Sequence, residues 1–165
     1  MPQPVLQTLF DPLLPFGLQW YWRADFVKEI SDDAIREHVK FANELPTMLS
    51  TMHLYSINGA AGRVKSTDTA WNYRDATYAM VIVGIDPSPA NKEKITSWAK
   101  EYWRALHPYS AGAAYVNFMM DEGEDRIRAT YGENYQRLAE IKARYDPHNF
   151  FRVNQNIKPL SETTS

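Results

Sequence analysis

Four stretches of the chain have the apolar pattern or composition of β-strands. Leu18–Arg23 is rich in aromatic residues with a period of two, and Met48–Ile57 also has a strand composition. Thr77–Ile85 is a run of Tyr, Val and Ile residues that ends before Asp86-Pro87, and the residues of Ala113–Met120 alternate again. We therefore predict four strands, of which Thr77–Ile85 has the clearest signal.

Apolar residues at helical spacing predict three helices between and after these strands. The first begins at Ser31, a residue type that caps helix N-termini, and ends at Pro46. The second extends from Ser88-Pro89 to Pro108, and the third covers Tyr131–Tyr145 and stops at Asp146-Pro147. The side chains expected to face the core are Ala34, Ile35, Val39, Ala42 and Leu45, then Ile95, Trp98, Ala99, Tyr102 and Leu106, and finally Tyr135, Leu138, Ile141 or Lys142, and Tyr145.

The order of these elements, strand-helix-strand twice and then a further helix, predicts an α+β fold. It matches a ferredoxin-like split β-α-β pair, in which an antiparallel sheet carries its helices on one face. We expect residues 1–17 to be an extended, proline-rich lead-in without a helix, because proline fixes φ and removes a hydrogen-bond donor. No linker divides residues 18–159, which we predict to be a single domain, and residues 160–165 form a polar tail.

Helices on one face of a sheet leave the other face open, and strand alternation indicates which side chains lie there. Tyr115 and Asn117 share one face of their predicted strand, and His53 and Tyr55 share one face of theirs. With Tyr21 of the first strand, several strands would contribute tyrosines and polar groups to one surface. Two interpretations stay open: tyrosines paired across a solvated sheet face, or a polar and aromatic platform for a small molecule.

Composition narrows the functional classes. The chain has 165 residues, 44% of them hydrophobic, which is enough for one globular domain with its own core. A net charge of −2 gives no electrostatic argument for binding nucleic acid or anionic lipid. The absence of cysteine excludes disulfides, thiol catalysis and thiolate metal sites. We predict no metal site, because His38, His107 and His148 lack the spacing of ligands.

Charge and hydropathy along the chain lead to two further expectations. The acidic run Asp121–Asp125 is expected to be a solvated loop. The first basic residue is Arg23, so the basic head of a signal peptide is missing, and the apolar run Ala76–Ile85 is far too short for a membrane span. We therefore expect a cytoplasmic protein that does not enter a membrane.

Several short blocks of sequence resemble a known family. They are Tyr21-Trp-Arg, His53-Leu, Arg63-Val, Thr69-Ala-Trp71-Asn-Tyr-Arg74, Ala-Tyr115-Val-Asn117-Phe-Met, Tyr131-Gly-Glu-Asn134-Tyr135, Tyr145-Asp146-Pro147 and Asn149-Phe-Phe151-Arg-Val-Asn154-Gln-Asn156-Ile157. Their order and close spacing resemble the berberine-bridge-enzyme C-terminal segment and substrate domain of FAD-linked oxidases, in the vanillyl-alcohol-oxidase superfamily. The resemblance covers nearly the whole chain, from Val5 to Pro159.

The resemblance implies a substrate-binding, flavin-capping domain of an FAD-dependent oxidoreductase that oxidises an alcohol, a sugar or a secondary metabolite. In the family an FAD-binding domain comes first and carries the pyrophosphate loop, whereas this chain has no G-x-G-x-x-G pattern. The implied partner is an FAD-binding domain or subunit in cis or in trans, and we expect the chain alone to be inactive and to bind FAD weakly or not at all. The alternative is a stand-alone ferredoxin-like module that binds a small molecule or forms a homodimer through its open sheet face.

The same resemblance implies roles for individual residues. Tyr115 occupies the first position of the family's Tyr-x-Asn motif and corresponds to a tyrosine that takes the substrate's hydroxyl proton while hydride passes to the flavin. Asn117, Asn154 and Asn156 correspond to cofactor-contacting amides. Phe118 stands where many relatives have a second tyrosine, which puts the identity of the base in question. Side chains expected on the substrate side are Tyr21, His53, Tyr55 and Arg74.

Overall fold

The computed structural model describes residues 1–9, 11–13 and 15–160. Its α-helices are α1 (Gln3–Gln7), α2 (Asp32–Asn43), α3 (Lys92–Leu106), α4 (Glu124–Tyr131) and α5 (Asn134–Tyr145), its strands are β1 (Gln19–Val27), β2 (Thr51–Ser56) and β3 (Tyr78–Asp86), and η5 (Val116–Phe118) is a 3-10 turn. None of the helices in these ranges combines the length and the apolar character needed to cross a bilayer.

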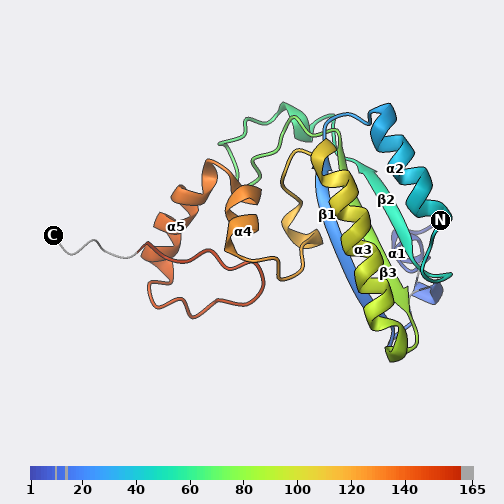
Figure 1. Ribbon diagram of the computed structural model, residues 1–165. Coiled ribbons are helices and arrows are strands. Elements are labelled where there is room, and N and C mark those ends of the chain that lie inside the picture. Colours follow the sequence, from blue (N-terminus) through green and yellow to red (C-terminus); the bar gives the residue numbers. More distant parts are fainter. Residues whose placement is uncertain (10, 14, 161–165) are drawn as a thin grey trace.

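The three strands form an antiparallel sheet in the order β1-β3-β2 (Figure 1). β3 is the central strand and is buried along nearly its whole length, while β2 forms an edge of the sheet. A strand covered on both faces has a continuous apolar sequence, which explains why this segment has the clearest strand signal. The predicted mixture of helix and antiparallel strand is therefore confirmed.

α2 and α3 cover one face of the sheet (Figure 1). Met80 and Ile82 of β3 pack there against the almost fully buried Tyr102 of α3. Gly84 permits a close approach of the helix, because a Cβ atom at this position would lie 2.7 Å from the Ile95 carbonyl oxygen. The absence of a side chain at Gly84 thus sets how closely α3 lies on β3.

The beginning of α2 agrees with the sequence, but its inner face does not. Ser31 Oγ accepts a hydrogen bond from the Ala34 backbone N–H at 3.2 Å, as the capping signal predicts. Ala34 is buried, whereas Ile35, Val39, Ala42 and Leu45 are exposed. The prediction that these four residues face the core is wrong, because the sheet and α3 cover the side of α2 that carries Ala34 and Phe41, and Leu45 follows the end of the helix.

The opposite face of the sheet is not bare over β1 and β3. Val81 and Val83 of β3 belong to a core cluster that includes Ile127 of α4 and Ala139 of α5. The expectation of helices on one face only is therefore wrong, since the C-terminal part of the chain packs against the second face. His53 and Tyr55 of the edge strand β2 stay exposed.

The predicted strand 113–120 is not formed. The Ala111 N–H donates to the Phe26 carbonyl oxygen at 2.8 Å, so the segment starts beside β1. The Phe118 N–H then donates to the Tyr115 carbonyl oxygen at 2.8 Å, and the backbone folds into η5 instead of continuing along the strand. With three strands in place of four, the ferredoxin-like arrangement is not confirmed.

Two further predictions about helices are wrong. The segment predicted as one helix over 131–145 contains the end of α4 and all of α5, separated at Gly132, whose φ is +51°. Ile141 and Tyr145 are exposed, although Tyr135 is buried as expected. At the other end of the chain, α1 lies inside the segment predicted to be extended, because Pro4 falls in its first turn, where a missing N–H costs no helical hydrogen bond. The domain limits at 18 and 159 stay a prediction, and residues 161–165 of the predicted tail lie outside the described residues.

Candidate functional site

A line of aromatic side chains extends from β2 across the sheet face to the loop between β2 and β3. Successive ring centroids are 5.7 Å apart for His53 and Tyr55, 5.4 Å for Tyr55 and Phe118, 5.2 Å for Phe118 and Tyr115, and 6.2 Å for Tyr115 and Trp71. We call these five residues the aromatic platform. It brings together three residues that the sequence marked, His53, Tyr55 and Tyr115, and each of them is exposed.

Tyr115 and Asn117, which were expected to be neighbours on a strand, are in direct contact through η5. Asn117 Nδ2 donates to Tyr115 Oη at 2.9 Å, and both side chains are exposed. Asn117 also lines a hollow of about 460 Å³ together with Trp22, Asn154 and Gln155. Two of the three predicted cofactor-contacting amides therefore border one polar hollow, with the phenol of Tyr115 hydrogen-bonded at its rim.

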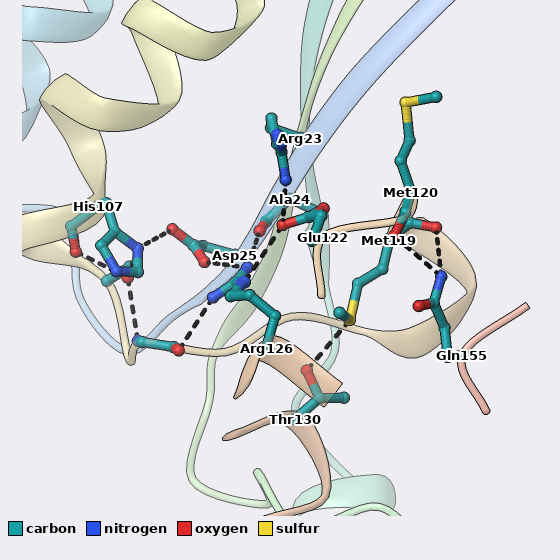
Figure 2. Close-up of polar contacts among 12 residues, drawn as sticks. Arg23, Ala24, Asp25, His107, Met119, Met120, Glu122, Arg126, Thr130 and Gln155 are labelled. Carbon is teal, nitrogen blue, oxygen red and sulfur yellow. Dashed lines mark hydrogen bonds and ion pairs between the residues drawn. The ribbon is translucent and has the colours of Figure 1, made fainter. Parts of the chain in front are cut away.

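Gln155 fixes the segment that carries this pair, a role the sequence reasoning missed. Its Nε2 donates to the carbonyl oxygens of Met119 at 3.0 Å and Met120 at 3.1 Å (Figure 2). Asn154 has a φ of +64°, a left-handed conformation that asparagine adopts more readily than most residues. Asn156 is half-buried and donates its backbone N–H to the Asn154 carbonyl oxygen at 2.8 Å. The place of Gln155 in the sequence, between the motif residues Asn154 and Asn156, was the signal that could have pointed to its role.

Tyr21 lies on the opposite face of the sheet from the aromatic platform. It packs with the core cluster formed by α2 and α3, and its Oη accepts a hydrogen bond from Arg23 Nε at 2.9 Å. The ammonium of Lys100 lies 5.4 Å from its ring centroid. The hypothesis that tyrosines of several strands share one surface is wrong for Tyr21, whereas His53 and Tyr55 do share the platform face.

Arg74 is part of the loop that carries Trp71. Its Nε donates to the Trp71 carbonyl oxygen at 3.1 Å, one Nη donates to the Ala61 carbonyl oxygen at 3.0 Å, and the other donates to Thr69 Oγ1. Its guanidinium carbon lies 4.8 Å from the centroid of the Trp71 ring. The structure thus places Arg74 against Trp71, and its hydrogen bonds go to the loop that holds this ring.

A cluster of charged side chains joins β1 to the two ends of the segment that carries Tyr115 (Figure 2). Asp25, with 0% of its side chain exposed, accepts from Arg126 at 2.9 Å and pairs with His107 at 2.8 Å. Glu122, with 1% exposed, pairs with Arg23 at 2.6 Å and with Arg126 at 3.2 Å. The expectation that 121–125 is a solvated loop is wrong at Glu122, because two arginines compensate its charge. The sequence contained a signal for this cluster: β1 carries two charged residues, Arg23 and Asp25, among aromatic and apolar ones.

Comparison with known proteins assigns the family. Residues 114–158 match the family model described as "Berberine and berberine like". The chain is 32% identical over 97% of its length to an FAD-linked oxidoreductase of Dictyostelium discoideum, and 35% identical over 81% of its length to the FAD-linked oxidoreductase YgaK of Bacillus subtilis. It is also 28% identical over 94% of its length to tetrahydroberberine oxidase of Berberis wilsoniae. The chain belongs to the berberine-bridge-enzyme-like family.

Solved structures of this family share the fold. Berberine bridge enzyme from Eschscholzia californica matches 89% of the chain with a TM-score of 0.76 and 21% identity. A glycopeptide hexose oxidase solved with teicoplanin matches 85% with a TM-score of 0.76 and 21% identity. This berberine-bridge-enzyme-like chain spans about a third of each relative: 35%, 29% and 33% of the three sequences, and 34% and 32% of the two structures.

This berberine-bridge-enzyme-like chain has a second hollow next to the polar one. It measures about 220 Å³ and is lined by Trp71, Tyr115, Val116 and Tyr131 among others. Val116 and Tyr131 line both hollows. Burial raises the pKa of Tyr131, so its hydroxyl stays protonated at neutral pH and can donate a hydrogen bond. The site therefore offers neutral donors, amides and aromatic faces.

Proposed function

We propose that this chain is the substrate-binding, flavin-capping part of an FAD-dependent oxidoreductase that oxidises an alcohol, a sugar or a secondary metabolite. The observation that supports this best is the hydrogen bond between Asn117 and Tyr115 at the rim of the polar hollow, within the region that matches the family model. Two similar proteins are named as a tetrahydroberberine oxidase and a glycopeptide hexose oxidase, which supports a secondary metabolite or a sugar as substrate.

The residues present fit one part of FAD. Asn117 and Asn154 are exposed amides on a polar hollow, and amides both donate and accept hydrogen bonds, as the carbonyls and N–H group at the edge of a flavin ring require. The sequence contains no glycine-rich phosphate-binding pattern. We infer that an FAD-binding domain or subunit, in cis or in trans, holds the phosphates, and that Asn117, Asn154 and Asn156 serve the ring side.

Each residue of the site then has a defined task. Bound FAD supplies a hydride acceptor. Once its own proton has left to solvent, Tyr115 Oη takes the proton of the substrate hydroxyl and becomes a neutral phenol as the hydride leaves the substrate carbon. The N–H of Asn117 stabilises the negative charge on Oη before that transfer. Because position 118 is phenylalanine, Tyr115 is the one phenol of the motif. Phe118 contacts the Tyr115 ring edge-on, with ring centroids 5.2 Å apart, and fixes its orientation. Tyr55, His53 and Trp71 present flat faces on which a ring of the substrate stacks.

The test is an NMR titration of the purified chain with two probes, FAD and lumiflavin, which has the flavin ring without the phosphates. We expect weak binding of both probes, with chemical-shift changes confined to the polar hollow and similar affinities, because the phosphates find no partner. Asn117→Ala should abolish these changes, and Asn43→Ala, at an exposed amide at the end of α2, should not. Light scattering on the same samples reports the oligomeric state.

Two outcomes contradict the proposal. Tight, saturable binding of FAD but not of lumiflavin would mean that the chain has a phosphate site of its own. No shift change with either probe, together with a clean dimer in light scattering, would favour the stand-alone module that buries its sheet face against a second copy.

A further inference from the structure

We propose that Arg126 is a positioning residue that holds Tyr115 and Asn117 in their hydrogen-bonded arrangement. This inference rests on the proposed function of that pair. Arg126 lies in the first half of α4, its side chain is 14% exposed, and it is absent from the linings of both hollows. It therefore acts on the site through other residues.

The guanidinium of Arg126 joins β1 to both ends of the segment that carries the pair, residues 112–122, which we call the site segment (Figure 2). On the β1 side, Nη2 donates to the Ala24 carbonyl oxygen and to Asp25 Oδ1, each at 2.9 Å. At the start of the site segment, Nη1 donates to the Gly112 carbonyl oxygen at 3.0 Å. At its end, Nε donates to Glu122 Oε2 at 3.2 Å. One side chain thus fixes where the site segment leaves β1 and where it returns.

The site segment depends on such contacts because it forms no strand. Its internal backbone bonds are those of the short turn η5. Other contacts hold one end each: Phe26 binds the start, and Gln155 binds Met119 and Met120 near the end. Among the hydrogen bonds of the described residues, those of Arg126 are the ones that join both ends through a single group.

The geometry requires arginine. A guanidinium carries five N–H groups in a rigid plane, so it can bind acceptors on several sides at once, whereas an ammonium is a point charge on a flexible stem. The charges also balance: the carboxylates of Asp25 and Glu122 face the two guanidinium groups of Arg23 and Arg126. Lysine at position 126 keeps this balance and removes the planar arrangement of donors, which makes Arg126→Lys the informative variant.

The experiment compares Arg126→Lys and Arg126→Met with Arg128→Met in chains labelled with 3-fluorotyrosine. Arg128 is a matched control, because it lies on the same helix and pairs with Glu124 at an exposed position. The fluorine signal of Tyr115, assigned with Tyr115→Phe, reports its packing against Trp71 and Phe118. The signal of Tyr102, a residue of α3 that is buried in the core, reports whether the fold is intact. Amide hydrogen exchange is measured on the same chains.

In Arg126→Lys we expect the Tyr115 signal to move toward that of a solvent-exposed fluorotyrosine, and exchange in the site segment to rise about tenfold or more, since several hydrogen bonds are lost locally. The Tyr102 signal and exchange in β3 should not change, and Arg128→Met should behave like the unmodified chain. Arg126→Met should show the same pattern with a larger amplitude.

Three results would overturn the inference. One is a folded Arg126→Lys chain with an unchanged Tyr115 signal and unchanged exchange in the site segment. The second is an equal rise of exchange in β3 and in the site segment, which would mean that Arg126 stabilises the whole fold and not the site segment in particular. The third is failure of Arg126→Lys to fold at all, which would also mean that Arg126 stabilises the whole fold. Lumiflavin titration separates the two proposals: absent binding in the unmodified chain, together with a clean dimer in light scattering, counts against the proposed function alone, and equal binding in Arg126→Lys refutes the positioning role alone.

Discussion

Replacing Gly84 with alanine tests how the sheet supports α3. An added Cβ would lie 2.7 Å from the Ile95 carbonyl oxygen and 2.8 Å from Ile95 Cβ, where an ordinary contact begins at 3.4 Å. The helix would therefore have to retreat by about 0.7 Å to restore an ordinary contact. Because the nearest atom belongs to the backbone, a rotamer change cannot relieve this contact.

The magnitude follows from the packing that such a retreat disturbs. Ile95, Ala99 and Tyr102 of α3 are at most 1% exposed, so a shift of the helix loosens contacts along most of its length. Overpacking of this kind costs about 2 kcal/mol, and a domain of this size then melts about 6 °C lower. We expect urea unfolding, followed by tryptophan fluorescence, to show a lower midpoint with an unchanged slope.

Gly59→Ala is the control for backbone strain. Gly59 has a φ of +77° and open space around it, so alanine there strains the backbone without touching α3. Near-UV circular dichroism of Trp98 and Tyr102 should therefore change in Gly84→Ala and not in Gly59→Ala. An alanine at position 84 that left stability unchanged would refute the argument from close approach. A free energy of unfolding that rose by about 0.5 kcal/mol would also refute it, because alanine would then act only by reducing the conformational entropy of the unfolded chain.

Three further predictions concern titration. Burial lowers the pKa of His38 below 6.5, so the unfolded chain takes up a proton first as pH falls; stability should drop below pH 6.5, and His38→Gln should remove that dependence in acid-titrated melts. Burial raises the pKa of Tyr102, whose hydroxyl is hydrogen-bonded to His38 Nδ1 at 2.7 Å, from 10.0 to about 12. Stability should therefore decline between those pH values, and in Tyr102→Phe an unchanged alkaline limb would count against this assignment. The hydrogen bond from Lys142 holds the pKa of Asp146 below 3.8, with help from the N–H groups of Phe150 and Phe151. Asp146 therefore contributes stability above pH 3.8 that is lost as pH falls through its folded pKa. In Asp146→Asn, the protection of the Phe150 and Phe151 amides from hydrogen exchange, relative to the unfolded chain at the same pH, should no longer depend on acid.

The central elements could be predicted because local signals and tertiary packing agree there. β3 has an uninterrupted apolar sequence and is buried on both faces, and the five predicted inward residues of α3 are all buried. Ser31 caps α2 as its residue type indicates. At these places no competing interaction changes what the local sequence favours.

The site segment could not be predicted as a loop, because its apolar and polar residues alternate as they would in a strand. The buried Ala114 precedes η5 and the buried Met119 follows it, so a turn and not a strand produces this pattern. The segment is held by the side chains of Arg126 and Gln155, which are distant in sequence and which no local pattern reveals. The pairing of Tyr115 with Asn117 was expected from a strand and arises from η5 instead. Here the sequence motif identified the residues, while the physical argument for their geometry was wrong.

The bonds that hold the site segment also have a consequence for the order of folding. Arg126 reaches back to Ala24 across 102 residues, and Gln155 reaches back to Met119 across 36. Closing such long loops costs entropy before any contact forms, so we expect these bonds to appear after the sheet and α3. During synthesis the sheet can assemble once α3 has emerged, whereas the site has to wait for Gln155, near the end of the described chain. A premature stop between α5 and Gln155 would therefore leave the sheet intact and the site without its last anchor.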